Sequence, residues 1–262
     1  MSSNASLRVL TGAAVALALS GTAMANTNVD ATSTGDLFLN IVDTTAQTSY
    51  LFDTGISQSS FTGTTSLPNV NLTSNANFNT FIGGTTGHVL DYSVVSGTFD
   101  GTVASTVLFT STLTGITPVP GSAEGQAWAS INGFLPNVNN ISSASTNDAI
   151  VPTATPYWGD PGVEGTFATQ LTASATGTNA AIGTAQGFYK MAASDLTSDT
   201  TAAVLSKFLG TWDLTSAGIL SYTVGAAVPL PAPLLLLLSG LGLTGLLGRR
   251  RTMTAAVGAA AA

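Results

Sequence analysis

Residues 36–53 read DLFLNIVDTTAQTSYLFD, and their pattern indicates that the chain folds mainly into β-strands. At the start of this stretch apolar residues alternate with others, so that Leu37, Leu39 and Ile41 share one face, as in a half-buried β-strand. Residues 48–53 have the aromatic and aliphatic composition of a second strand, and a polar segment separates the two. The stretch therefore predicts a β-hairpin.

Strand-like segments rich in Val, Phe, Tyr and Thr recur along the chain between Gly, Pro and Asn turn residues. The expected strands are residues 88–95, 98–110, 165–175, 182–192, 207–214 and 218–224. The first two of these are separated either at Ser96-Gly97 or at Asp100-Gly101. Because strands do not alternate with long helices, the pattern predicts a mainly β fold, an antiparallel β-sandwich-like domain.

One or two short helices are expected beside the strands. Residues 74–82 suit a short helix with Ser74 as its N-cap, and residues 122–138 have apolar side chains at helical spacing. A further short helix is conceivable at residues 198–207. Residues 137–160, rich in Asn, Ser, Thr and Pro, are expected to form a long loop.

The N-terminus has the three parts of a secretory signal peptide. Arg8 provides a small positive region, a short apolar run follows, and Ala23 and Ala25 form a small-x-small cleavage site. The apolar run is too short for a first transmembrane helix. The signal peptide is therefore expected to span residues 1–25, with export through the Sec machinery, cleavage by signal peptidase and Asn26 as the mature N-terminus.

A second targeting segment lies near the C-terminus, where Val228, Pro229, Leu230, Pro231 and Ala232 read VPLPA. The prolines favour an extended backbone over these residues. The leucine-rich residues 233–248 follow and predict one transmembrane helix. Residues 234–248 would span about 22 Å as a helix, and flanking residues bring the segment to the lower limit for a bilayer.

Three consecutive basic residues, Arg249, Arg250 and Arg251, follow the apolar segment. Positive charge at one end of a membrane span favours the cytoplasmic side. This topology would leave the alanine-rich tail, residues 252–262, in the cytoplasm and residues 26–227 outside. A buried helix of an ordinary domain is the alternative, but the segment has no amphipathic face and ends in three arginines.

The order of short proline motif, apolar helix and arginine cluster resembles the PEP-CTERM sorting signals of Gram-negative bacteria, in their VPLPA-type variant. The resemblance covers residues 228–251. It implies recognition by an exosortase, a membrane-embedded cysteine-type enzyme that cuts near the motif and releases or transfers the exported part. The tail of residues 252–262 departs from the family pattern, in which the chain stops soon after the arginines.

The expected exported domain, residues 26–227, is acidic. It contains all thirteen acidic residues of the chain but only two of the basic ones, Lys190 and Lys207, so its net charge is near −11. This charge argues against nucleic acid as a partner. The chain has no cysteine, which excludes disulfides and thiolate metal sites.

Three patterns are reminiscent of catalytic or cofactor sites, and each has a simpler explanation. Residues 52–55 read FDTG, as in aspartic proteases, but no second such motif exists to pair with Asp53. Residues 240–245 satisfy G-x-G-x-x-G, yet they lie inside the expected membrane span. His88 is the one histidine and has no thiolate or second imidazole to form a zinc site.

The adjacent aromatic residues Tyr157 and Trp158 lie in a Pro- and Gly-flanked segment. They could form a platform that stacks on a sugar, or they could anchor the loop to the core. The sequence thus predicts a non-enzymatic structural protein without metal or cofactor, sorted to the cell surface or to an extracellular polysaccharide matrix. The alternative is a surface-anchored module that binds carbohydrate or another partner.

Overall fold

The structure is a computed structural model. It describes residues 35–99, 106–113, 115–141, 147–153, 156–172 and 177–225. By its internal contacts the chain divides into two units, Met1–Val224 and Gly225–Ala262. All helices and strands of the described residues belong to the first unit.

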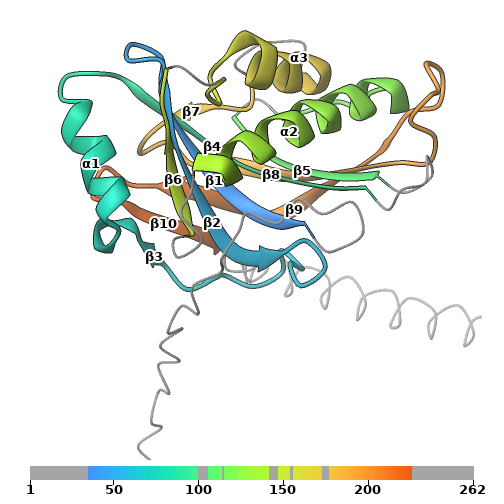
Figure 1. The fold of residues 1–262 in the computed structure, drawn as a ribbon. Coiled ribbons are helices and arrows are strands. Elements are labelled where there is room, and N and C mark those ends of the chain that lie inside the picture. The colour runs from blue at the N-terminus through green and yellow to red at the C-terminus, as the bar shows by residue number, and fades with distance from the viewer. Residues whose placement is uncertain are drawn as a thin grey trace, which may run out of the picture. The chain divides into compact units, whose positions relative to one another are not determined.

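The strands of the described residues form one antiparallel sheet, in the order β3-β10-β9-β8-β5-β4-β1-β2-β6, with β7 paired to β4 (Figure 1). The strands are β1 (Asp36–Asp43), β2 (Thr48–Ser57), β3 (Val70–Asn71), β4 (Leu90–Phe99), β5 (Thr106–Thr112), β6 (Asp148–Val151), β7 (Ala180–Ala181), β8 (Gln186–Ala193), β9 (Val204–Leu214) and β10 (Ile219–Val224). The mainly β, antiparallel prediction is confirmed. The expected sandwich-like arrangement fits only loosely, because the strands share one continuous ladder instead of dividing between two sheets.

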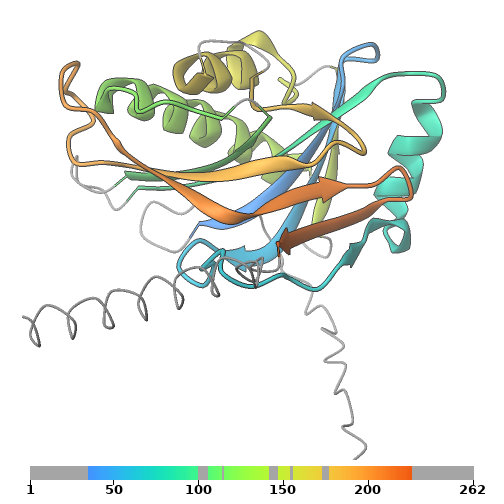
Figure 2. The same ribbon diagram turned by 180° about the vertical axis from the view of Figure 1, so that it is seen from behind.

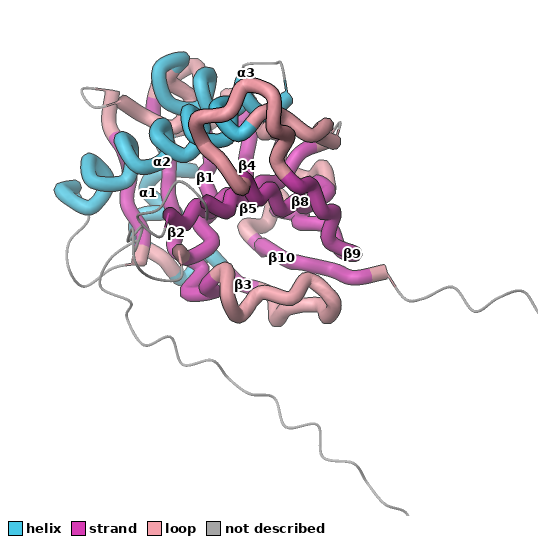
Figure 3. Tube along the Cα trace, turned by 90° about the vertical axis from the view of Figure 1, so that its right-hand side faces the viewer, coloured by secondary structure: helices cyan, strands magenta, loops and turns pink. Residues whose placement is uncertain are grey.

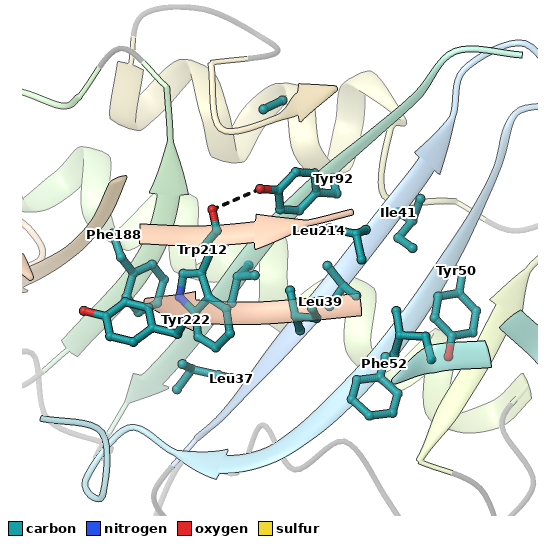
Figure 4. Close-up of a cluster of buried hydrophobic side chains, with 14 of the residues drawn as sticks. Leu37, Leu39, Ile41, Tyr50, Phe52, Tyr92, Phe188, Trp212, Leu214 and Tyr222 are labelled. Atoms are coloured by element: carbon teal, nitrogen blue, oxygen red, sulfur yellow. Dashed lines mark hydrogen bonds between the residues drawn. The ribbon is translucent and has the colours of Figure 1, made fainter. Parts of the chain in front are cut away.

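The sheet is strongly curled, so strands that are not neighbours in the ladder face one another across its interior. The Tyr92 hydroxyl on β4 lies 3.1 Å from the carbonyl oxygen of Trp212 on β9 and 2.8 Å from that of Thr184, and its single proton is shared between these two acceptors. Figure 4 shows the contact with Trp212. Strands β8 and β5 separate β4 from β9 in the ladder. The curl, which follows from the twist of long strands, therefore creates an enclosed space within a single sheet.

Three α-helices accompany the sheet in the described part of the chain: α1 (Ala76–Gly84), α2 (Gly121–Ile141) and α3 (Thr166–Thr172). Helices α2 and α3 pack on each other and lie over the same face of the sheet, whereas α1 lies apart from them (Figures 1 and 3). Helix α1 contacts β6 and β2 at one end of the ladder, and the short 3₁₀ turn η1 (Leu72–Ser74) that precedes it contacts β10 near the other end. The segment from η1 to α1 thus bridges the two ends of the curled sheet.

The sheet has a hydrophobic core on each face, so its central strands are buried on both sides. On β1 the predicted row of Leu37, Leu39 and Ile41 faces the interior of the curl, while Phe38 and Val42 face α2 and α3. The interior core is rich in aromatic rings, as the close-up in Figure 4 shows. Phe61 contacts Phe109, Phe188, Phe208, Trp212 and Tyr222, with ring centroids 5.0–6.2 Å apart.

Several local predictions are confirmed. Strands β1 and β2 form the expected hairpin, and β9 and β10 form another, closed by a turn that ends at Gly218 with φ 74°. Helices α1 and α2 lie close to their expected positions. The N-cap of α1 is Asn75. Ser74, the predicted N-cap, is the last residue of the 3₁₀ turn that precedes the helix. Strand β4 continues through Ser96 and Gly97, so the connection to β5 comes later, in residues outside the described part.

Three segments differ from expectation. Residues 165–175 were expected as a strand, but most of them form α3, because Phe167, Ala168 and Leu171 bury one helical face. The loop expected at residues 137–160 contains the end of α2 and strand β6. The helix expected at residues 198–207 is a polar turn that leads into β9, in which the Ser198 hydroxyl accepts a hydrogen bond from the Thr201 amide at 2.8 Å.

Candidate functional site

The residues of the two predicted targeting segments lie outside the described part of the chain. These are Ala23, Ala25 and Asn26 at the N-terminus, the motif Val228–Ala232, the apolar residues 233–248 and the arginines 249–251. Within the described ranges no helix is long and apolar enough to cross a membrane. The sorting motif and the transmembrane helix therefore stay predictions from sequence.

Trp158 is a core residue. Its side chain is fully buried, and its ring contacts Phe38, Phe134 and Phe167 at centroid distances of 6.3, 5.4 and 5.5 Å. Its backbone amide donates to the Ser49 hydroxyl at 3.1 Å, which fixes the segment on β2. A ring enclosed in this way presents no face to a sugar, so Trp158 cannot be part of a carbohydrate-stacking platform. Of the two interpretations, anchoring of the segment to the core is the one that the burial of Trp158 supports.

Tyr157, the other member of that pair, is half-buried and surrounded by acids. Burial raises the pKa of the Tyr157 hydroxyl, and the negative charges of Asp160, Glu164 and Asp43 raise it further. The ring packs at the border of the core under α2 and α3. Tyr157 alone therefore lacks the paired ring that would make a stacking platform.

The FDTG motif forms an irregularity in the first hairpin. Gly55 has φ 67°, which favours glycine, and the pairing of β1 with β2 shifts register beside it. The Gly55 amide donates to Asp53 Oδ1 at 2.8 Å, and the Thr54 hydroxyl donates to the Leu37 carbonyl at 2.6 Å. The motif thus holds a bulged strand in place.

Asp53 itself is almost fully buried, and its Oδ2 atom has no hydrogen-bond partner among the described residues. Burial raises the pKa of Asp53 to about 6, although the hydrogen bond from Gly55 lowers it; the nearby charge of Asp36 raises it further. The pKa of Asp36 is also raised, by burial. These two acids are neighbours, but neither lines the cavity described below.

His88 pairs with Asp43 across the end of the sheet. The two atoms His88 Nδ1 and Asp43 Oδ2 lie 2.6 Å apart, and Asp43 Oδ1 accepts hydrogen bonds from the amides of Thr45 and Ala46 at 2.9 Å. Burial acts to raise the pKa of Asp43, but the hydrogen bonds from His88, Ala46 and Thr45 outweigh it and the pKa is lowered. The pair ties the β1–β2 turn to the start of β4, a structural role for the one histidine.

Two buried glutamates were not anticipated from the sequence. Glu164 lies in the π-helical turn η2 (Pro161–Gly165), where its Oε1 accepts a weak hydrogen bond of 3.4 Å from the Thr178 hydroxyl. Burial raises the pKa of Glu164 to about 8, with a smaller contribution from the charge of Asp91. The sequence places this residue in a Pro-Gly turn, where an acid would ordinarily be solvated.

Glu124 is the second. It is fully buried on the face of α2 that also contains Ala127, Ile131 and Phe134, and neither of its carboxyl oxygens has a hydrogen-bond partner in the described part of the chain. Burial alone raises the pKa of Glu124 to about 8. The spacing of positions 124, 127, 131 and 134 is helical, so a helical projection of the sequence would have placed this carboxyl on the apolar face.

These acids are dispersed instead of converging on one site. Among the described residues no group of three or more His, Asp or Glu side chains is placed to hold a metal ion. A small cavity of about 240 Å³ lies near the end of β2, lined in part by Gly55, Ser60, Phe61 and Thr62. It is smaller than typical ligand pockets of about 300–1,000 Å³. Its hydroxyls are engaged locally, since Ser60 donates to the Ser57 carbonyl at 2.9 Å.

No protein-family model matches the chain, and no curated protein or solved structure is significantly similar to it.

Proposed function

We propose that the chain is an exported structural protein that an exosortase-like enzyme sorts and processes at its C-terminus. The β-rich domain is then displayed at the cell surface or in the extracellular polysaccharide matrix. The observation that carries this proposal is the order of the VPLPA motif at Val228–Ala232, the apolar residues 233–248 and the arginine cluster 249–251.

The described fold is compatible with this role in two respects. Strand β10, the last strand of the described domain, ends at Val224, a few residues before the motif. A processing enzyme that cuts near Val228 would therefore leave every strand of the sheet intact. The domain is also held together by two buried cores and continuous strand pairing, as an exported chain without cysteine requires.

The test is the intact mass of the protein recovered from cells and medium, in strains with and without the exosortase-like enzyme. The expected product begins at Asn26 and ends near the VPLPA motif, and it appears only when the enzyme is present. Replacement of Pro229 and Pro231 by alanine should abolish the truncation.

The matched control replaces two exposed prolines away from the motif, Pro68 and Pro152, by alanine and should leave processing unchanged. Recovery of a single species that still contains residues 249–262 in every strain would contradict the proposal. The protein would then be a simple C-terminally anchored envelope protein.

A further inference from the structure

Two unpartnered polar side chains lie side by side in the core on the helix-covered face of the sheet. Asn40 on β1 and Ser93 on β4 are both fully buried, and they are partners across the ladder. Within the described ranges, neither the side-chain amide of Asn40 nor the hydroxyl of Ser93 has a hydrogen-bond partner. Buried polar groups in folded proteins are nearly always paired with protein, ordered water or a bound ion. This pair of groups therefore calls for a binding partner.

The turn η2 and the residues before it lie over Asn40. Strand alternation places Asn40 between Phe38 and Val42 on one face of β1, and both belong to the core under α2 and α3. The ring centroid of Trp158 lies 6.3 Å from that of Phe38, and a Cβ added to Gly159 would lie 2.5 Å from Cγ1 of Val42. Views from opposite directions show α2 and α3 on the same side of the sheet (Figures 1 and 2). Asn40 is thus enclosed between the sheet and this segment.

A third unpartnered oxygen comes from the segment just before β7, which pairs with β4. Asn179 is 9% exposed, and its Oδ1 atom has no hydrogen-bond partner among the described residues. The pairing of Ala180 with Tyr92, extended by one residue, places Asn179 beside Ser93. Since Ala180 faces the interior of the curl, strand alternation turns Asn179 to the opposite face, the one that Ser93 shares.

Two acids adjoin these neutral oxygens. Glu164 in η2 is buried, and its amide donates to the Trp158 carbonyl at 3.1 Å, while its carboxyl accepts the hydrogen bond from Thr178. Asp91 lies on the helix-covered face of β4, and its charge contributes to the raised pKa of Glu164, so the two carboxyl groups lie close enough to interact. In the part of the chain that the structure describes, no Lys, Arg or His side chain forms an ion pair with either acid.

We propose that the folded domain binds a calcium ion through the side-chain oxygens of Asn40, Asp91, Ser93, Glu164 and Asn179. Calcium takes about six to eight oxygen ligands from carboxylates, amides and water, and its coordination geometry is flexible. Three neutral oxygens and two carboxylates fit this preference, and the two negative charges match a divalent ion. A donor set of oxygens alone is less suited to zinc or copper, which favour imidazole and thiolate.

The sequence gives no sign of such a site, because its residues are spread from position 40 to position 179. Neutral oxygens would take the place of a third acid or histidine, which the described residues do not offer. Asp91 is only partly buried and would connect the site with solvent. Calcium would tie β1 and β4 to η2 and to the segment before β7, and it would stabilise the folded state that binds it. The inference concerns the folded domain and does not depend on how the C-terminus is processed.

The test is a calcium titration of the purified full chain in mild detergent, after dialysis against EGTA. Calorimetry should show one calcium ion bound with a dissociation constant of roughly 10⁻³ M or tighter, as in extracellular calcium-binding domains. The chain should unfold at a higher temperature in calcium than in equal magnesium, which demands a stricter octahedral shell. No binding up to about 10 mM calcium, or equal stabilisation by the two ions, would overturn the proposal.

A first variant, Glu164→Gln, removes one carboxylate with little change in size. It should weaken calcium binding by about tenfold or more, because the affinity of calcium sites follows the charge of their ligands. The matched control is Asp160→Asn in the same turn. Asp160 Oδ1 accepts a hydrogen bond from the Gly162 amide at 2.7 Å, and asparagine can accept the same bond. Because Asp160 is partly exposed, the dissociation constant of the control should stay within about threefold of the parent value.

A second variant, Asn40→Leu, replaces the unpartnered amide by an apolar group of similar size. Without calcium it should unfold at the same temperature as the parent or at a higher one, because a buried polar group without a partner is costly. With calcium it should gain no further stability. The far-UV circular dichroism of all variants should match that of the parent. If Glu164→Gln or Asn40→Leu binds calcium as tightly as the parent, these side chains are not ligands and the proposal fails.

Discussion

At the scale of the residue, Glu124 is the clearest conflict between side-chain chemistry and position. Its carboxyl lies in an apolar core without a hydrogen-bond partner among the described residues, and burial raises its pKa to about 8. The folded state therefore retains a proton on Glu124 at pH values where the unfolded chain has released it. Since the folded pKa is the higher one, this group favours folding at low pH, and its contribution is lost as the pH rises from about 4.5 to about 8.

The prediction is that Glu124→Gln flattens the pH dependence of stability. Each such group adds a slope of about 1.4 kcal/mol per pH unit within its window, so the variant should be relatively more stable than the parent at pH 8 than at pH 5. Urea unfolding followed by tryptophan fluorescence at several pH values measures this. The control Asn132→Gln changes an exposed side chain on the same helix and should leave the slope as it is. An unchanged slope in Glu124→Gln would show that the carboxyl is solvated.

At the scale of the element, the turn between β9 and β10 depends on Gly218. Its φ of 74° favours glycine, and an added Cβ would lie 2.8 Å from Cε1 of Phe78, a buried residue of α1. The turn thus positions the last hairpin and also accommodates the helix that bridges the ends of the sheet.

We expect Gly218→Ala to destabilise the domain by about 1–3 kcal/mol, through backbone strain and displacement of Phe78. The matched substitution Gly83→Ala lies in the last turn of α1, where an added Cβ meets no atom within 4 Å. It should be neutral or stabilising by up to about 1 kcal/mol, because alanine favours the helix. Urea denaturation of both variants measures the difference, and equal effects would show that the turn tolerates a side chain.

The sequence predicted those helices and strands whose local residue pattern matches the side-chain burial that they have in the folded domain. The alternation in β1 identified the first hairpin, the strand-like residues 207–214 and 218–224 identified β9 and β10, and helical spacing identified α2. Helix α3 was missed because its Thr and Phe residues also suit a strand, and packing of Phe167, Ala168 and Leu171 on the core selects the helix. Strand β6 was missed because a segment of four residues has too little periodicity to distinguish it from a loop.

At the scale of the whole molecule, the order of strands was beyond local pattern, since it depends on which distant segments pair. The expected sandwich and the observed curled sheet both contain many short antiparallel strands, and they differ only in how those strands are joined. The same distinction applies to function. The proposed sorting motif is legible because its pattern is linear in sequence, whereas the burial of Asp53 and Glu164 depends on tertiary packing.

The position of a strand in the ladder predicts its protection from hydrogen exchange. Strand β1 pairs along its length with β2 and β4 and is buried on both faces, so its amides should exchange only through global unfolding. The end strands β3 and β6 are short and paired on one side, so they should exchange faster by local opening. Mass spectrometry of peptic peptides after deuteration measures both. Equal protection of β1 and β6 would contradict the ladder order.

The position of β10 at the end of the domain also determines how late in synthesis the fold can close. It is the final strand of the domain, yet it pairs with the early segment β3, and the Tyr222 hydroxyl donates to the Gly63 carbonyl at 3.0 Å. A chain that emerges N-terminus first can assemble β1, β2 and β4, but its aromatic interior stays uncovered until residue 224 has arrived. A product truncated before Ile219 would leave the rings of Phe61 and Trp212 accessible to proteases. Closure of the fold therefore depends on synthesis through the last residues of β10.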